Sequence, residues 1–149
     1  MGIIIRHLQP ADQAEWLRLR FALWPQPHHK LSGLKAELEE ILADPEQPVF
    51  VAVRPEGGLC GFLEVSIHTE AEGCTTDRIG YLEGWYVDPD RRGISIGRKL
   101  VEAAEQWARE QGCTVMASDT TLDYPLSPEA HSRLGYQEAQ RTIHFRKEL

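Results

Sequence analysis

The sequence predicts an α/β fold in which helices flank a mixed β-sheet. Segments with the two-residue period of strands alternate with segments of helical period, in the order strand, helix, helix, three strands, helix, strand, helix, strand. The composition, 42% hydrophobic and 26% charged over 149 residues, is that of an ordinary globular domain. No internal repeat or linker divides the sequence, so residues 1–149 are predicted to form a single domain.

The first third of the chain is predicted to contain one strand and two helices. Residues 3–7 form a strand-like apolar run, and Pro10 opens a helix whose apolar residues recur at helical spacing. Pro25 ends that helix. The apolar residues between positions 34 and 42 indicate a second helix, which stops at Asp44 and the proline that follows it.

The middle of the chain is predicted to form three consecutive strands. Residues 49–53 and 59–68 are rich in β-forming residues, and the Pro-Glu-Gly-Gly turn at positions 55–58 joins them as a hairpin. A polar loop leads to a third strand at residues 79–87, which the Asp-Pro-Asp sequence at positions 88–90 closes.

The last third is predicted to alternate helix and strand. Residues 97–111 have the clearest helical pattern of the chain, and Gly112 caps the end of that helix. Residues 114–119 indicate a short strand, and a loop rich in proline and serine then precedes a short helix that ends at Gly135. Residues 136–145 are predicted to close the chain as a strand.

The charge and the cysteines exclude several classes of protein. The net charge of -7 argues against nucleic-acid binding, which needs a basic face, and favours cationic partners. The apolar run at residues 3–5 is too short for a signal peptide or a membrane span, so we expect a cytoplasmic protein. Cys60, Cys74 and Cys113 form no Cys-x-x-Cys pair, which argues against a disulfide framework or a zinc site.

The segment from Tyr81 to Leu100 has the pattern of an anion-binding site, because a strand, a tight loop and a helix follow one another. The first N–H groups of a helix lack internal partners and can hold a phosphate. Taken alone, such a loop fits an ordinary turn with solvated arginines, and it lacks the glycine patterns of dinucleotide and nucleotide triphosphate sites. Its small residues are Gly93, Ser95 and Gly97, and its cations are Arg91, Arg92, Arg98 and Lys99.

The loop resembles the acetyl-coenzyme A (acetyl-CoA) motif of the GNAT family of N-acetyltransferases, Arg/Gln-x-x-Gly-x-Gly/Ala. Arg92, Ser95 and Gly97 stand in its three defined positions, and Ser95 replaces the usual first glycine. Further segments are similar to the aminoglycoside 6'-N-acetyltransferases of that family. These segments are residues 23–25, 81–87, 112–113, 116–120, 131, 134–136 and 144–147.

The resemblance implies a GNAT fold with a mixed, mostly antiparallel sheet, acetyl-CoA as cosubstrate without a metal, a small polycationic amine as substrate, and a homodimer. It assigns to the cofactor the main chain of Trp85, Tyr86 and Val87 and the pyrophosphate loop Arg92, Gly93, Ile94, Ser95, Ile96, Gly97 and Arg98. Tyr124 stands where relatives carry an asparagine that contacts the cofactor. On the substrate side it assigns Trp24, Glu83 and Asp119, and Gln140 stands where relatives carry a further acidic residue.

Two carboxylates suit the chemistry of acetyl transfer to an amine. A primary amine is protonated at neutral pH, so a group must bind the ammonium and then accept its proton. Taken alone, Glu83 fits an outward strand residue and Asp119 a turn or a helix cap. The resemblance favours a catalytic role for both, and which of them is the base stays open.

Other reactive residues have simpler interpretations. His131 stands near the place where many family members carry a tyrosine that protonates the departing thiolate, and it also fits a packed histidine. His28 and His29 have no third metal ligand at useful spacing. Cys113 follows the end of a helix, where the dipole disfavours a thiolate, so we expect it to be buried rather than nucleophilic.

The sequence thus predicts an enzyme that moves an acetyl group from acetyl-CoA to an aminoglycoside amine by direct attack in a ternary complex. Two alternatives remain at this point. In the first, the acceptor is another cationic amine, such as a polyamine or a protein amino group. In the second, the protein is a non-catalytic CoA-binding sensor.

Overall fold

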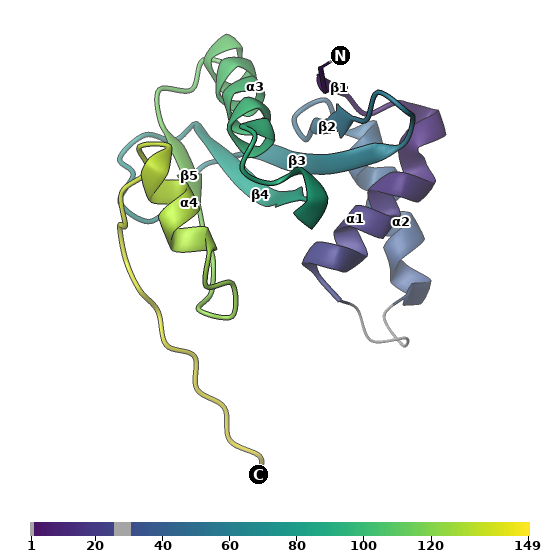
Figure 1. Ribbon diagram of the computed structural model, residues 1–149. Coiled ribbons are helices and arrows are strands. Elements are labelled where there is room, and N and C mark those ends of the chain that lie inside the picture. The colour runs from purple at the N-terminus through teal and green to yellow at the C-terminus, as the bar shows by residue number, and fades with distance from the viewer. Residues whose placement is uncertain (1, 26–30) are drawn as a thin grey trace.

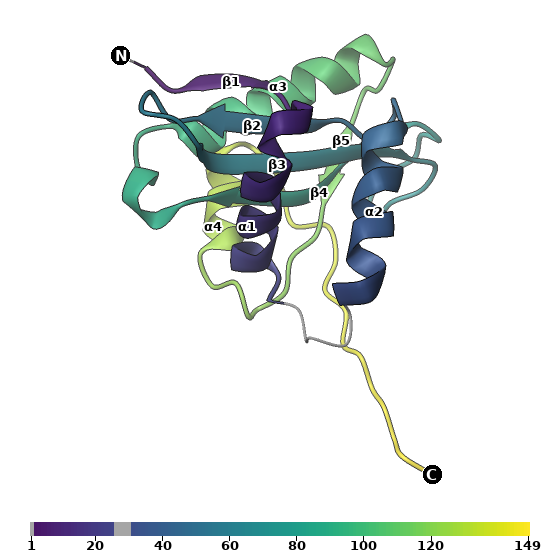
Figure 2. The same cartoon turned by 90° about the vertical axis from the view of Figure 1, so that its right-hand side faces the viewer.

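The computed structural model describes residues 2–25 and 31–149, in which five strands form one sheet with helices on both faces (Figures 1 and 2). The strands are β1 (Ile4–His7), β2 (Val49–Val53), β3 (Leu59–His68), β4 (Ile79–Val87) and β5 (Met116–Ser118). The α-helices are α1 (Gln13–Leu23), α2 (Leu31–Ala43), α3 (Ile96–Glu110) and α4 (Ser127–Arg133), with short 3₁₀ turns at Pro10–Asp12 and Pro89–Arg91.

The sheet is mixed and mostly antiparallel. Its strands lie in chain order, with antiparallel pairing from β1 through β4 and one parallel pair, β4 with β5. This arrangement confirms the predicted fold class. No helix in the described part of the chain is long and apolar enough to cross a membrane.

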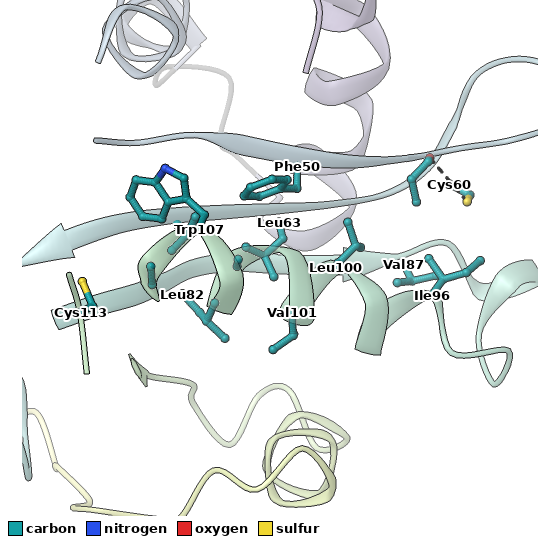
Figure 3. Close-up of a cluster of buried hydrophobic side chains, with 14 residues drawn as sticks. Phe50, Cys60, Leu63, Leu82, Val87, Ile96, Leu100, Val101, Trp107 and Cys113 are labelled. Atoms are coloured by element: carbon teal, nitrogen blue, oxygen red, sulfur yellow. Dashed lines mark hydrogen bonds between the residues drawn. The ribbon is translucent and has the colours of Figure 1, made fainter. Parts of the chain in front are cut away.

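Each face of the sheet packs on its own helical layer because side chains alternate along a strand. Helices α1 and α2 lie on one face, where Trp16, Leu19 and Phe62 are fully buried, and α3 lies on the other (Figure 2). Leu63 of β3 packs there with Leu100 of α3 in the cluster that Figure 3 shows. The two layers hold β3 and β4 rigidly from both sides.

The bounds of the middle strands agree with the sequence prediction, whereas the predicted last strand is wrong. Strands β2, β3 and β4 begin and end where the alternation predicts, and α3 is displaced by one residue. Residues 136–145 form no strand: Tyr136 still packs on the domain and its hydroxyl donates to Glu105, and the end of the chain extends away from the domain (Figure 1). Ile143 and Phe145 remain 78% and 91% exposed, because β-forming residues need a neighbouring strand and none pairs with this segment in the described residues.

Candidate active site

A β-bulge places Glu83 on the face of the sheet that α1 and α2 cover. Glu64 of β3 pairs with Gly84 and Val65 pairs with Leu82, so Glu83 is an extra residue on β4. Bulges of this kind redirect side chains and are frequent next to active sites. Here Glu83 and Gly84 both face the α1 side, as their contacts with Ser66 and with Trp24 show.

Glu83 lies at a cavity of about 630 Å³ that α1, α2, β3 and β4 enclose. The carboxylates that line it are Glu37, Glu40, Asp44, Glu46, Glu64 and Glu83. Arg20 is the only Lys or Arg among the described lining residues, and it is 9% exposed and faces Glu64. The cavity therefore has the negative charge that a polycationic ligand requires.

One oxygen of Glu83 is held by two neighbours on β3. The Ser66 hydroxyl donates to Oε1 at 2.6 Å, and His68 Nε2 lies 2.5 Å from the same oxygen. Because a carboxylate only accepts, His68 Nε2 carries the hydrogen of that contact. Oε2 has no hydrogen-bond partner in the described part of the chain, so it is free to meet a ligand in the cavity.

Asp119 is connected to the same region through Tyr81. The Tyr81 hydroxyl donates to Asp119 Oδ2 at 2.7 Å. Burial of the phenol, and then its bond to Asp119, raise the pKa of Tyr81, so it stays a donor at neutral pH. The Tyr81 ring also stacks on His68 with ring centroids 4.0 Å apart, and His68 contacts Glu83. The structure thus joins the two predicted carboxylates in one chain of contacts.

Trp24 lies over Gly84 at the end of α1. A Cβ atom at position 84 would overlap the Trp24 indole and lie 2.8 Å from its Cζ2 atom. The missing side chain of Gly84 therefore lets Trp24 pack against β4 and line the cavity. Trp24, predicted on the substrate side, thus lies at the same cavity as Glu83.

The cavity floor contains a buried carboxyl group, Glu64, and a buried cation, Arg20, which were not predicted from the sequence. Glu64 accepts a bond from Trp16 Nε1 at 3.0 Å and lies 3.0 Å from Arg20 Nε. Burial raises the pKa of Glu64 to about 7, although Arg20 acts in the opposite direction. The alternation of Glu64, Ser66 and His68 along an apolar strand was the signal that marks this polar stripe.

The predicted cofactor loop has a backbone shaped for an anion. Gly93 and Ser95 both have positive φ, 81° and 70°, and Ser95 directly precedes α3. A Cβ atom at Gly93 would meet nothing within 4 Å, so the loop is open on that side. Arg92, Arg98 and Lys99 are exposed and form no ion pair with a described residue. The loop can therefore offer N–H groups and cations to a phosphate.

Two residues of the predicted cofactor site also make side-chain hydrogen bonds within the protein. Arg92 Nε donates to the carbonyl of Val87 at 2.8 Å, which fixes the loop against the end of β4. Trp85 Nε1 donates to the carbonyl of Gly97 at 3.1 Å, and a Cβ atom at Gly97 would lie 3.2 Å from the Trp85 ring. The small size of Gly97 thus accommodates the Trp85 ring. The N–H group of Gly97 lies in the first turn of α3.

The β4 main chain is open where the cofactor is predicted to bind. Strand β5 pairs with β4 only from Gly80 to Leu82, so the edge of β4 beyond Leu82, including Trp85 and Tyr86, has no strand neighbour on that side among the described residues. This edge leads directly to the loop that begins at Arg92. The structure therefore brings the strand and loop halves of the predicted cofactor site together.

The other predicted site residues have local partners or lie apart. His131 Nδ1 donates to the carbonyl of Ser127 and Nε2 contacts the Ser118 hydroxyl, each at 2.8 Å. The Tyr124 hydroxyl donates to the carbonyl of Leu23, which ties its loop to α1.

Gln140 is exposed on the extended C-terminal segment and does not line the cavity. The segment that carries Gln140 was predicted to be a strand of the sheet, and it does not join the sheet. His28 and His29 lie outside the described residues. Within those residues, no group of three or more His, Cys, Asp or Glu side chains could hold a metal ion. Cys113 is 6% exposed, and burial raises the pKa of its thiol.

Comparison with known proteins places the chain in a family. The model of the acetyltransferase (GNAT) family matches residues 11–136. The chain therefore belongs to the GNAT family of acetyltransferases, and it is an acyltransferase.

Particular relatives are similar over nearly the whole chain. The aminoglycoside N(6')-acetyltransferase type 1 of Klebsiella aerogenes is 41% identical over an alignment of 150 positions that covers 98% of this chain and 97% of that protein. The protein of the same name from Stenotrophomonas maltophilia is 39% identical over 97% of this chain and 93% of its own length. The structure of AAC(6')-Iy in complex with the bisubstrate analogue CoA-S-monomethyl-acetylneamine matches with a TM-score of 0.88 at 32% identity and covers 100% of both chains.

Proposed function

We propose that this protein transfers an acetyl group from acetyl-CoA to the 6'-amino group of an aminoglycoside. The observation that carries the proposal is the acidic cavity that ends at Glu83, beside a β4 edge and loop shaped for a phosphate-bearing cofactor. The relatives named as aminoglycoside N(6')-acetyltransferases support the substrate class. The six carboxylates of the cavity suit a molecule with several ammonium groups.

The residues present fit acetyl-CoA. The N–H groups at the start of α3 and the side chains of Arg92 and Arg98 would hold the pyrophosphate, and the open main chain at Trp85 and Tyr86 would hold the pantetheine arm. When bound, acetyl-CoA supplies the electrophilic thioester. The open edge of β4 runs from Glu83 towards the loop, so the thioester end would lie on the carboxylate side.

Glu83 and Asp119 bind and deprotonate the amine in this proposal. The unpartnered Oε2 atom of Glu83 accepts a hydrogen bond from the ammonium group inside the cavity. Loss of a proton to one of the two carboxylates leaves the nitrogen with a free electron pair for direct attack on the thioester carbonyl, where the C–S bond would break and CoA would leave as a thiolate that takes up a proton. The exposure of both side chains gives that proton a path to solvent.

His131 has a positioning role in this proposal beside the proton-donor role that the resemblance implies. Its Nε2 atom contacts the hydroxyl of Ser118, the residue before Asp119, at 2.8 Å. We propose that His131 fixes the end of β5 and thereby the position of Asp119.

Thiol release from acetyl-CoA tests the proposed activity. Aminoglycosides, polyamines and lysine peptides are offered in turn at matched concentrations. The proposal predicts release with aminoglycosides and little with the other two. Preferential release with polyamines or peptides would assign the protein to another amine, and CoA binding without release in any of them would make it a sensor.

We further propose a cytoplasmic homodimer of single-domain chains. The extended C-terminal segment exposes Ile143 and Phe145, and β5 has no strand on its outer side in the described residues, so a second copy is the natural cover for both. Light scattering should give about twice the 16.9 kDa chain mass, and a chain ending at Gln137 should lose the dimer. A monomer at micromolar concentration would contradict this arrangement.

A further inference from the structure

His68 is linked to both predicted carboxylates of the site. It is the last residue of β3, and its Nε2 atom contacts Glu83 Oε1. Its ring stacks on Tyr81 with an interplanar angle of 7°, and the Tyr81 hydroxyl donates to Asp119. The imidazole thus contacts Glu83 directly and is linked to Asp119 through Tyr81.

These contacts define the orientation of Glu83. A glutamate side chain on a strand has several accessible rotamers, and immobilising one of them requires partners at its head group. Ser66 and His68 both bind the same oxygen, Oε1, which leaves Oε2 unpartnered in the described residues. The stack on Tyr81 holds the His68 ring in the plane that this contact needs.

We propose that His68 is a positioning residue that holds Glu83 Oε1, and thereby presents Glu83 Oε2 to the substrate ammonium group. Tyr81 supports His68 on one ring face and holds Asp119 with its hydroxyl, so both carboxylates depend on the same pair of rings. This inference rests on the proposed function, because the ammonium group belongs to the proposed substrate.

Two substitutions separate the hydrogen bond from the stacking. His68→Phe keeps an aromatic ring on Tyr81 but removes the donor to Glu83, and kcat/KM for an aminoglycoside should fall roughly tenfold to a hundredfold. His68→Gln places an amide N–H near the same point and should recover most of that loss. The affinity for the aminoglycoside, measured by calorimetry without acetyl-CoA, should weaken in the Phe variant and recover in the Gln variant.

A double-mutant cycle with Glu83→Gln tests whether His68 acts through Glu83. If it does, His68→Phe in the Glu83→Gln background should change kcat/KM by less than about twofold, because the group that it positions is already gone. Independent losses that multiply in the double variant would overturn the inference. A purely structural role would also give multiplying losses.

Controls separate this inference from the proposed function. His7 of β1 packs on Phe50 at a tilt of 39° with ring centroids 4.6 Å apart, outside the cavity at Glu83, so His7→Phe is a comparable change that should leave kinetics unaltered. Acetyl-CoA affinity should be the same in all variants. An active wild type with an equally active His68→Phe variant would overturn the positioning role alone, whereas a wild type inactive on every aminoglycoside would overturn the proposed function and this inference with it.

Discussion

Glu83 and Asp119 each stand one residue beyond the last paired position of the parallel β4–β5 ladder, Leu82 with Ser118. The two strands therefore stop pairing where the predicted carboxylates begin. A bulge on β4 turns Glu83 towards the acidic cavity, and Tyr81 binds Asp119. The end of the ladder thus creates both the acidic pair and the open β4 edge next to it.

Removal of either charge should reduce catalysis and spare the cofactor site. General-base assistance contributes roughly 10²- to 10⁴-fold, so Glu83→Gln or Asp119→Asn should lower kcat/KM by about that factor if the residue is the base. The true base should also abolish the acidic limb of the pH profile, whereas a residue that only anchors the ammonium should mainly raise KM. Acetyl-CoA affinity by calorimetry is the control. Turnover and KM within about twofold in both variants would place the active site elsewhere.

Ser95→Gly should leave the protein as stable as the wild type or more stable by up to about 1 kcal/mol. Ser95 has a φ of 70°, which costs a residue with a side chain about 1–2 kcal/mol, and the greater unfolded-state entropy of glycine offsets part of that gain. The β-branched Ser95→Val should be destabilised. Urea unfolding and acetyl-CoA calorimetry check both. A Gly variant that is less stable, or that binds acetyl-CoA more weakly, would show that the serine side chain itself is needed.

Gly84→Ala should displace Trp24 and weaken substrate binding. The new Cβ atom overlaps the indole, and the loss of one aromatic contact worth about 0.5–1.5 kcal/mol predicts a KM for the aminoglycoside that is roughly two- to tenfold higher. The KM for acetyl-CoA should not change. Gly33→Ala on α2 is the control because its Cβ atom would meet nothing within 4 Å. An unaltered aminoglycoside KM in the Gly84 variant would remove Trp24 from the substrate site.

The buried Glu64 should make stability depend on pH. Burial raises its pKa from 4.5 to about 7, so within that window the folded chain keeps a proton that the unfolded chain releases. Its contribution to stability is therefore complete at low pH and is lost as the pH rises towards 7. Glu64→Gln cannot ionise and should gain stability relative to the wild type between about pH 5 and pH 8 in urea unfolding. If the free energies of unfolding of the variant and the wild type differ by the same amount across this range, the raised pKa of Glu64 is contradicted.

Local sequence patterns predicted the middle of the fold because they depend on local physics. The alternation in β3 and β4 and the glycines between β2 and β3 define those strands without reference to distant residues. The predicted strand at residues 136–145 fails for the opposite reason. Its β-forming residues become a strand only if another strand pairs with them, and the rest of the chain offers none in the described residues.

The candidate site residues were predicted through the resemblance to the GNAT family. Taken alone, Glu83 and Asp119 fit structural positions and the loop from Arg92 to Arg98 fits an ordinary turn, so local chemistry by itself did not assign their roles. Ser66 and His68 were missed because their contacts with Glu83 depend on the β3–β4 register and on its bulge. The register is a long-range property that the local pattern does not encode.

The most direct test of the central claim compares two aminoglycosides that differ at one atom. One carries a 6'-amino group, and its analogue carries a 6'-hydroxyl group with the remaining structure unchanged. After incubation of each with the wild-type enzyme and acetyl-CoA, mass spectrometry of the product and thiol release are measured together. The account predicts one added acetyl group on the 6'-amino compound and none on the analogue. Equal acetylation of both compounds, or acetylation of neither, would contradict it.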